Sequence, residues 1–222
     1  MRIKLIGCIS TKNEVLAMQP GSPADCVFFD FSLHACPGKL HRELQQTINT
    51  CQDYDKIILT YGRCSRAVEG LASARVPLVL PNAHDCISVL LGSDLRRQEQ
   101  SARNPAAYYF SQGWLDYGRN PYDEYLEYIE KYGQDKAHYL IQSLYGAYRE
   151  AIFIRTAADR KKIEEYRQKV KQIASFFGWK ISEVAGDLEL LNAVVNQLSH
   201  PGVIRVAPGT PIVLEEGIFN AD

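Results

Sequence analysis

The chain has 222 residues, of which 46% are hydrophobic, and a formal net charge of −1 at pH 7. This length allows one large domain or two small halves, with enough apolar residues for a buried core. Because the net charge is near zero, the chain lacks the overall positive charge that is typical of proteins that bind nucleic acid or anionic membranes. The apolar runs are far shorter than the roughly 20 residues of a membrane span, and we see no apolar leader. We therefore expect a cytoplasmic protein with no nucleic-acid or membrane partner.

Short apolar runs typical of strands recur along the chain, at 2–9, 26–33, 56–61, 77–80, 107–111, 151–155, 179–184 and 203–206. Between them, apolar residues at helical spacing predict helices, most clearly over 37–51, 163–177 and 188–198. Strands that alternate with helices indicate a parallel sheet. We expect a three-layer α/β fold with a mainly parallel sheet and helices on both faces. Two Rossmann-like halves, 1–106 and 107–222, packed as one compact unit, would fit this pattern.

All six cysteines lie within the first 86 residues. In a reducing cytoplasm we do not expect disulfides, which leaves metal binding, catalysis or plain burial. Cys26 opens an apolar run, and Cys51 falls on the apolar face of a predicted helix. We interpret both as core residues, because small thiols are often buried.

Thiol and imidazole side chains follow four predicted strands: Cys8, His34 with Cys36, Cys64, and His84 with Cys86. The carboxyl ends of neighbouring parallel strands meet at one edge of a sheet, where sites are commonly built. Cysteine and neutral histidine are the usual ligands of zinc and iron. We therefore expect Cys64, His84 and Cys86 to hold zinc or iron, with Cys8 or His34, a water or a substrate as the fourth ligand.

The local sequence favours the thiolate form of Cys86 and Cys64. Asp85 can cap a helix that begins at Cys86, and Ser65 can cap one after Cys64, and the dipole at the N-terminus of a helix stabilises a negative charge. The spacing is not a tight signature such as paired CxxC motifs. The alternative interpretation is that these cysteines are core residues and that His-Asp-Cys is a packed turn.

Two weaker patterns indicate a ligand site. Gly92 and Ser93 are followed by Arg96, Arg97 and Arg103, an arrangement that can receive a phosphate or carboxylate but is also typical of a solvated helix. Gly113 and Trp114 follow a Tyr-Tyr-Phe run that contains Tyr109, and these rings are either a ligand wall or core. The chain has no GxGxxG, GxxxxGK[ST] or GxSxG motif, which argues against dinucleotide, P-loop and α/β-hydrolase functions.

The order of several short motifs resembles the domain-of-unknown-function family numbered 1638. The motifs are Tyr61-Gly62-x-Cys64, Pro77-Leu78-Val79, Pro81, His84-Asp85-Cys86-Ile87, Leu91-Gly92-Ser93, Tyr108-Tyr109 and Gly113-Trp114, with Leu33-His34, Gly186-Asp187-Leu188 and Pro208-Gly209 outside them. The resemblance spans nearly the whole chain. The chain departs from the family pattern at Arg63 and at Ser65-Arg66, where an apolar and a small residue are expected.

The resemblance implies an uncharacterised family found near corrinoid methyltransferases, and it supplies no reaction. It adds weight to Cys64, His84 and Cys86 as a site. We expect a metal-binding protein that acts in, or is accessory to, one-carbon or corrinoid methyl metabolism, with a corrinoid protein or methyltransferase as partner. The alternatives are an enzyme that resembles zinc-dependent thiol methyltransferases and a non-metal module that binds a small molecule. The residues that we expect to contact such a molecule are His34, Gly92, Ser93, Tyr109 and Trp114.

Overall fold

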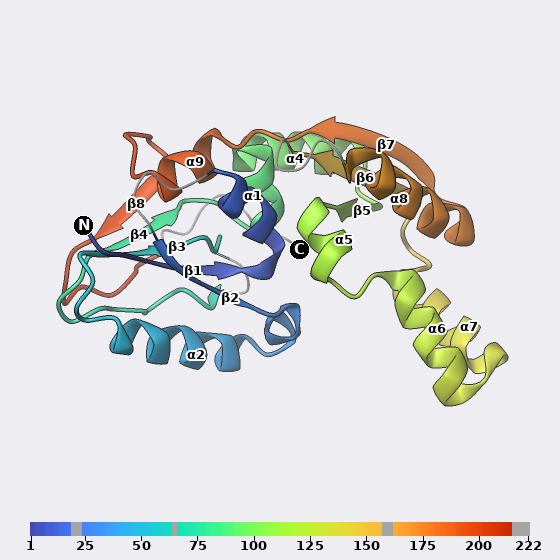
Figure 1. Cartoon of the computed structure of the whole chain (residues 1–222). Coiled ribbons are helices and arrows are strands. Elements are labelled where there is room, and N and C mark those ends of the chain that lie inside the picture. The colour runs from blue at the N-terminus through green and yellow to red at the C-terminus, as the bar shows by residue number, and fades with distance from the viewer. Residues whose placement is uncertain (19–23, 64–65, 157–161, 215–222) are drawn as a thin grey trace.

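The computed structural model describes residues 1–18, 24–63, 66–156 and 162–214 and shows a mixed α/β protein built on two sheets (Figure 1). The first sheet has the strand order β2-β1-β3-β4-β8. Its strands are β1 (Ile3–Cys8), β2 (Ala24–Phe29), β3 (Lys56–Leu59), β4 (Leu78–Pro81) and β8 (Val203–Val206). The first four run parallel, and β8 pairs antiparallel with β4.

Helices cover both faces of the first sheet. On one face lies α2 (Pro37–Thr50), which buries Leu40, Leu44 and Ile48 against it. On the other face lie α1 (Lys12–Ala17), α3 (Cys86–Leu91) and α9 (Glu189–Val195). Figure 1 shows the sheet between these two groups of helices. The helix–sheet–helix layering follows from the strands, whose buried residues point to both faces.

The second sheet has the order β5-β6-β7 and is wholly parallel. Its strands are β5 (Ala107–Phe110), β6 (Glu150–Arg155) and β7 (Lys180–Ala185). The helix α8 (Ile163–Phe177) packs on one face through an aromatic core that also includes α5 (Gln112–Tyr117). From the other face, α3 contributes Leu90 and Leu91 to a cluster with Ile154. β5 is an edge strand of this sheet, because among the described strands it pairs only with β6.

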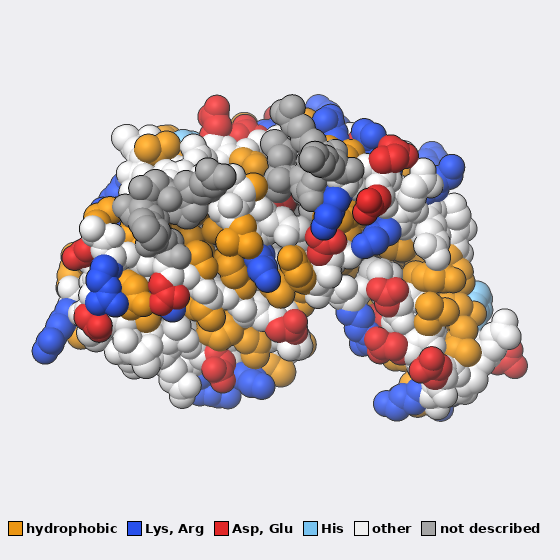
Figure 2. Space-filling model, in the orientation of Figure 1, with side chains coloured by type: hydrophobic (Ala, Val, Ile, Leu, Met, Phe, Trp, Pro, Cys, Tyr) orange, Lys and Arg blue, Asp and Glu red, His pale blue; other side chains and the backbone are white. Residues whose placement is uncertain are grey.

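Three further helices and two short 3-10 helices complete the described part of the chain. The 3-10 helices are η1 (Ile9–Thr11) and η2 (Phe31–Ala35), and α4 (Asp94–Arg103) follows α3. The helices α6 (Pro121–Tyr132) and α7 (Gln134–Tyr145) form a hairpin that projects from the second half, as Figure 1 shows. Figure 2 shows the surface hollowed between this hairpin and the first half. Among described residues, no helix is long and apolar enough to cross a membrane.

The α/β class, the mainly parallel sheet and the helical layers are confirmed. The observed strands match the predicted runs to within a few residues, apart from 26–33, where the strand starts at Ala24 and ends at Phe29. There the Asp30 carboxylate accepts a hydrogen bond from Ser32 N and starts η2. The division at 106/107 stays a prediction, and the last strand, β8, returns to the first sheet.

Two local expectations need correction. Cys26 is only partly buried, because β2 is the edge strand of the first sheet. The helix expected over 188–198 ends at Val195, and Leu198 is 48% exposed. Cys51, in contrast, is buried as expected, and its thiol donates a hydrogen bond to Thr47 O at 3.0 Å.

Candidate functional site

A cavity of about 250 Å³ lies between the two halves. The first half contributes Ser10, which follows β1, and the start of α3. The second half contributes the edge strand β5 and the start of α5. The lining residues are Ser10, Cys86, Ile87, Leu90, Arg97, Ala107, Tyr108, Tyr109, Phe110, Ser111, Trp114, Tyr148 and Ile154. The cavity therefore has mainly apolar and aromatic walls, contributed by both sheets and the helices around them.

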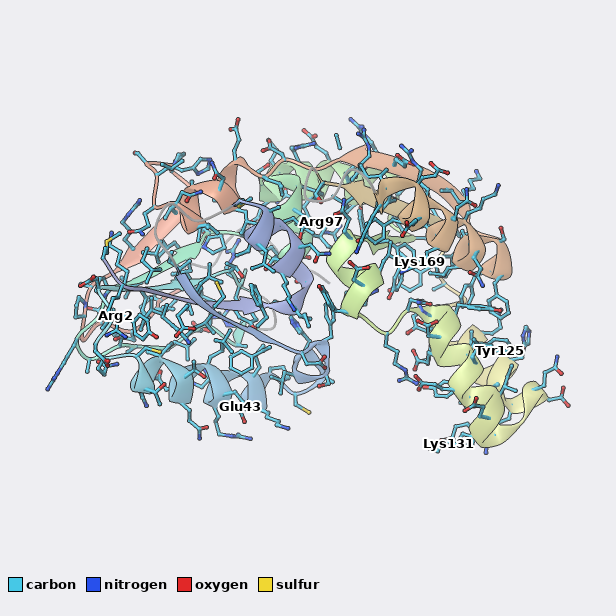
Figure 3. The ribbon with its side chains drawn as sticks, in the orientation of Figure 1. Arg2, Glu43, Arg97, Tyr125, Lys131 and Lys169 are labelled. Carbon is cyan, nitrogen blue, oxygen red and sulfur yellow. The ribbon has the colours of Figure 1, made fainter. Side chains whose placement is uncertain are left out.

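Arg97 is the charged side chain among the described residues that line this cavity. It lies on α4, between the two halves, as Figure 3 shows. Its Cζ lies 4.6 Å from the centroid of the Tyr109 ring, so the guanidinium stacks on one wall. Its Nε lies 3.5 Å from Asp85 Oδ2, and its Nη1 donates to Ser101 Oγ. A guanidinium carries five N–H donors, so these contacts leave donors for a ligand.

Tyr109 brings a second polar group to the cavity. Its hydroxyl is buried and has no hydrogen-bond partner among the described residues. A buried hydroxyl without a partner is costly, and in native proteins such groups commonly bind a water or a ligand. Arg97 and Tyr109 therefore add polar groups to a lining that is mainly apolar and aromatic.

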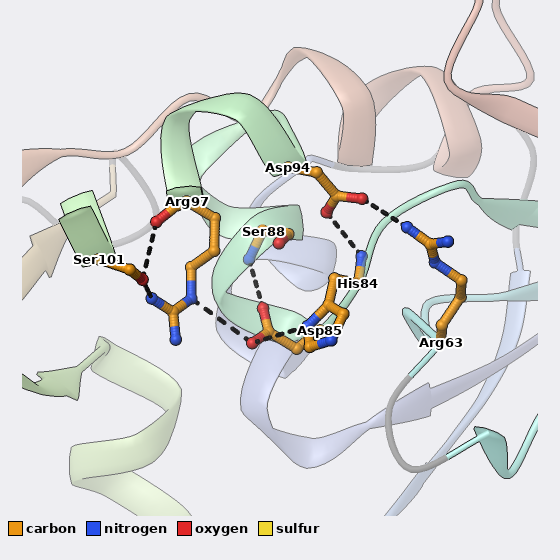
Figure 4. Close-up of polar contacts among 7 residues, drawn as sticks. All are labelled: Arg63, His84, Asp85, Ser88, Asp94, Arg97 and Ser101. Carbon is orange, nitrogen blue, oxygen red and sulfur yellow. Dashed lines mark hydrogen bonds and ion pairs between the residues drawn. The ribbon is translucent and has the colours of Figure 1, made fainter. Parts of the chain in front are cut away.

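Two carboxylates, those of Asp85 and Asp94, hold together the segment around α3 that joins β4 to α4 (Figure 4). Asp85 caps α3 by accepting a hydrogen bond from Ser88 N at 2.7 Å, as the sequence predicts. The other Asp85 oxygen lies 3.5 Å from His84 Nδ1 and 3.5 Å from Arg97 Nε. The cap thus places Cys86, which is one of the residues that line the cavity, at the first position of α3, where a helix dipole favours a thiolate.

Asp94 links this loop to the segment that follows β3. Its Oδ1 accepts a hydrogen bond from His84 N at 2.7 Å, and its Oδ2 lies 2.6 Å from Arg63 Nη2. The two segments also touch through the backbone, since Arg63 N donates to Ala83 O at 2.7 Å. A Cβ atom on Gly62 would lie 2.9 Å from the same oxygen, so a glycine permits this approach. Arg63 immediately precedes Cys64, which lies outside the described residues.

Cys8 and His34 form a pair at the carboxyl end of β1. The Cys8 Sγ lies 3.2 Å from His34 Nε2. Burial raises the pKa of the Cys8 thiol, and hydrogen bonding from Ser10 only partly opposes this. Burial also lowers the pKa of His34. These shifts favour a neutral thiol and a neutral imidazole and oppose a preformed thiolate–imidazolium pair. The neutral imidazole can bind a metal as it is, whereas the thiol must first lose its proton.

The remaining predicted site residues do not form one cluster. Cys36 is exposed and His84 is 46% exposed. Gly92 ends α3 with a φ of +85°, and a Cβ there would lie 2.8 Å from Asp187 Cγ. Its role in the structure is therefore to permit a tight turn and the close approach of Asp187. Ser93 caps α4 by accepting from Arg96 N. Trp114 lines the cavity and packs edge-on against Phe31, with the ring centroids 4.3 Å apart.

Among the described residues, no group of three or more His, Cys, Asp or Glu side chains lies close enough to hold a metal ion. Cys64 stands outside that set, so the three-residue grouping of Cys64, His84 and Cys86 stays a prediction. The structure does bring His84 and Cys86 onto one turn and brings Arg63 against that turn.

Sequence reasoning missed several residues at the junction of the two halves. Ser10 carries no motif and does not stand out in the sequence, whereas Arg97 belongs to the arginines after Gly92 and Ser93 that the sequence indicates can receive a phosphate or carboxylate. The sequence also gives no sign that Glu14 is fully buried, because its helix has only six residues and shows little periodicity. The sequence signals that do lead to this cavity are the Gly113-Trp114 pair at the start of α5, Tyr109, Cys86 and the arginines after Ser93.

The comparisons with known proteins give one match. The model of a family described as "Protein of unknown function (DUF1638)" matches residues 28–195, which is well over half of the chain. No curated protein and no solved structure matches the chain. The matched range covers His34, the segment around Cys64, the His84–Cys86 turn, Arg97, Tyr109 and Trp114. The chain therefore belongs to this family of unknown function.

Proposed function

We propose that the protein binds a small anionic molecule with a flat apolar body in the cavity between its two halves. The observation that carries this proposal is that the Arg97 guanidinium stacks on the ring of Tyr109, whose buried hydroxyl has no partner among the described residues, and that both residues line a cavity with aromatic walls. A guanidinium recognises carboxylates and phosphates through paired N–H donors. The aromatic walls favour a planar apolar group on the ligand.

The size of the cavity limits the ligand. A volume of about 250 Å³ is below the roughly 300–1,000 Å³ of sites for drug-sized ligands. A one-ring or short branched carboxylate or phosphate monoester fits this volume, whereas a dinucleotide does not. No lining residue among those described is a carboxylate, so a cationic ligand would lack a counter-charge there.

Binding of matched pairs of small molecules tests this function. Benzoate and benzamide have nearly the same shape but differ in charge, and isobutyrate and phenyl phosphate extend the panel. We expect benzoate or another anion of the panel to bind, measured by calorimetry, and the neutral amide to bind at least tenfold more weakly. In Arg97→Met this preference should disappear, whereas Arg103→Met, a change at the end of α4, should retain it. No binding by any anion of the panel, or equal binding of the amide, would contradict the proposal.

A second proposal is that Cys64, His84 and Cys86 bind zinc or iron, with Cys8 or His34 as a further ligand. The supporting observation is the 2.7 Å hydrogen bond from Arg63 N to Ala83 O, which joins the residue before Cys64 to the residue before His84. The short Cys8–His34 distance adds a second pair of suitable donors. Such a metal would deprotonate a bound thiol for attack on a methyl donor, which is the chemistry that one-carbon or corrinoid methyl metabolism requires.

Metal content after anaerobic purification tests the second proposal. We expect about one zinc or iron per chain by elemental analysis, and less than half of that in Cys64→Ala and in Cys86→Ala. The exposed Cys36 provides the control, because Cys36→Ala should keep its metal. Full occupancy in both variants, or a metal-free wild type under anaerobic conditions, would contradict it. Methyl transfer from a methylated corrinoid to a thiol then tests whether the protein is itself an enzyme or an accessory protein.

A further inference from the structure

A buried carboxyl group lies where the two halves meet. Glu14, on α1 of the first half, is 0% exposed. Its Oε1 accepts a hydrogen bond from the Thr156 hydroxyl at 2.8 Å, and Thr156 directly follows β6 of the second half. Gln112, the first residue of α5, is also 0% exposed and donates from Nε2 to Thr156 O at 3.2 Å. Three buried side chains from both halves thus form one polar cluster.

This cluster is short of donors. Glu14 Oε2 and Gln112 Oε1 are both buried, and neither has a hydrogen-bond partner within the described part of the chain. When Glu14 is ionised, its charge is stabilised by the Thr156 hydroxyl and by the backbone N–H of Glu14 itself, and these only partly offset its burial. A buried carboxylate normally needs more donors or a cation. Protonation of Glu14 removes the charge and adds a donor to the cluster.

Among the described residues, no charged group near Glu14 supplies a counter-charge. Asp116 on α5 acts on it through its field and repels the ionised form. The other charged side chains on the packed elements pair elsewhere or are exposed: Lys12 lies over the Tyr117 ring, Arg155 pairs with Glu183, and Glu189 of α9 is exposed. Burial, more than this repulsion, raises the pKa of Glu14 to about 7.

The same elements form the wall of the cavity. The η1 segment, which carries Ser10, leads directly into α1, and α5 carries both Gln112 and Trp114. Trp114 of α5 also packs against Phe31 of the first half. A change in how α1 meets α5 therefore changes how the two sides of the cavity meet.

We propose that a proton on Glu14 closes the junction between the two halves, and that loss of this proton opens the junction and the cavity. Closure itself needs no ligand, whereas its effect on ligand affinity rests on the function proposed above. An open junction would hydrate Glu14 and let it ionise near its ordinary pKa of 4.5. The ratio of closed to open forms then falls about tenfold per pH unit between these two pKa values and levels off above pH 7.

Quenching of Trp114 fluorescence by acrylamide tests this proposal without any ligand. The chain has two tryptophans, and Trp179→Phe leaves Trp114 as the only one. In this background we expect the quenching constant of Trp114 to rise by at least twofold between pH 5 and pH 7.5. With Glu14→Gln added, which is neutral at every pH, the constant should stay at its low-pH value.

Two further variants make the test specific. Glu130→Gln changes an exposed carboxyl on α6 and should keep the wild-type pH profile. Burial lowers the pKa of His34, whose ring lies 6.1 Å from that of Phe31, and His34 is kept in every variant, so a pH response that came from His34 would persist in Glu14→Gln. If Glu14→Gln fails to fold, Thr156→Val removes the donor from the other side of the junction and should raise quenching already at pH 6. A profile that is flat in the wild type, or equally steep in Glu14→Gln, would overturn the proposal.

Discussion

Gly113 lies so close to Ser10 that a Cβ atom on the glycine would stand 2.2 Å from the Ser10 carbonyl oxygen. No real side chain tolerates this distance, so the backbone of α5 contacts the backbone of η1 directly. This contact joins the second half to the first beside the cavity. The polar cluster of Glu14, Gln112 and Thr156 lies on the same junction.

Gly113→Ala should therefore force α5 away from η1. Overpacking of this kind typically costs about 1–3 kcal/mol, and we expect a loss of that size in the free energy of unfolding measured in urea. Acrylamide should also quench Trp114 more strongly in the folded variant. Gly38→Ala is the control, because the nearest atom to a Cβ there is Arg42 Nη1 at 3.9 Å. A Gly113→Ala protein as stable as the wild type would contradict the close contact.

Asp94→Asn should weaken the proposed metal site without removing a ligand. Asp94 joins Arg63 to the His84 backbone, and an amide oxygen attracts the guanidinium less than a carboxylate does. Loss of groups that orient ligands typically lowers metal affinity by about 10–100-fold. Competition with a chelator measures this change, and Asp53→Asn, at a side chain that is 75% exposed, should show none. Equal affinities in the wild type and Asp94→Asn would argue against a site on this loop.

Glu14 should make stability fall as pH rises. Its pKa is about 7 in the folded chain and 4.5 when unfolded, so the unfolded chain releases this proton first. The stabilisation is complete below pH 4.5, is lost between pH 4.5 and 7, and changes no further above pH 7. The shift corresponds to about 3 kcal/mol. Urea unfolding of the wild type and Glu14→Gln should therefore diverge by that amount across this range, and a difference independent of pH would show that Glu14 does not titrate there.

Cys51→Ala should destabilise the protein without changing its metal content. The Cys51 thiol is buried and donates to Thr47 O, and its removal should cost about 1 kcal/mol in thermal or urea unfolding. Cys26→Ala should cost less, because Cys26 is only partly buried at the sheet edge. Loss of metal in Cys51→Ala with unchanged stability would show that its role is not structural.

The sequence predicted the strands because runs such as 56–61 and 151–155 are apolar and bounded by polar or turn residues. Helical periodicity likewise located the helix that buries Leu40, Leu44 and Ile48. These signals are local, so a single sequence contains them. The Asp85 cap is local too, since the carboxylate and the Ser88 amide are three residues apart.

The cavity and its chemistry depended on contacts that no local pattern records. Arg97 and Tyr109 are twelve positions apart on different elements, yet the guanidinium stacks on the ring and both line the cavity. Glu14 and Thr156 are separated by 142 positions, and their hydrogen bond exists because two sheets pack together. The sequence by itself determined the strands, the most strongly amphipathic helices and the types of residue available for a site. Only the tertiary structure decided which side chains meet, because burial and pairing depend on how distant segments pack.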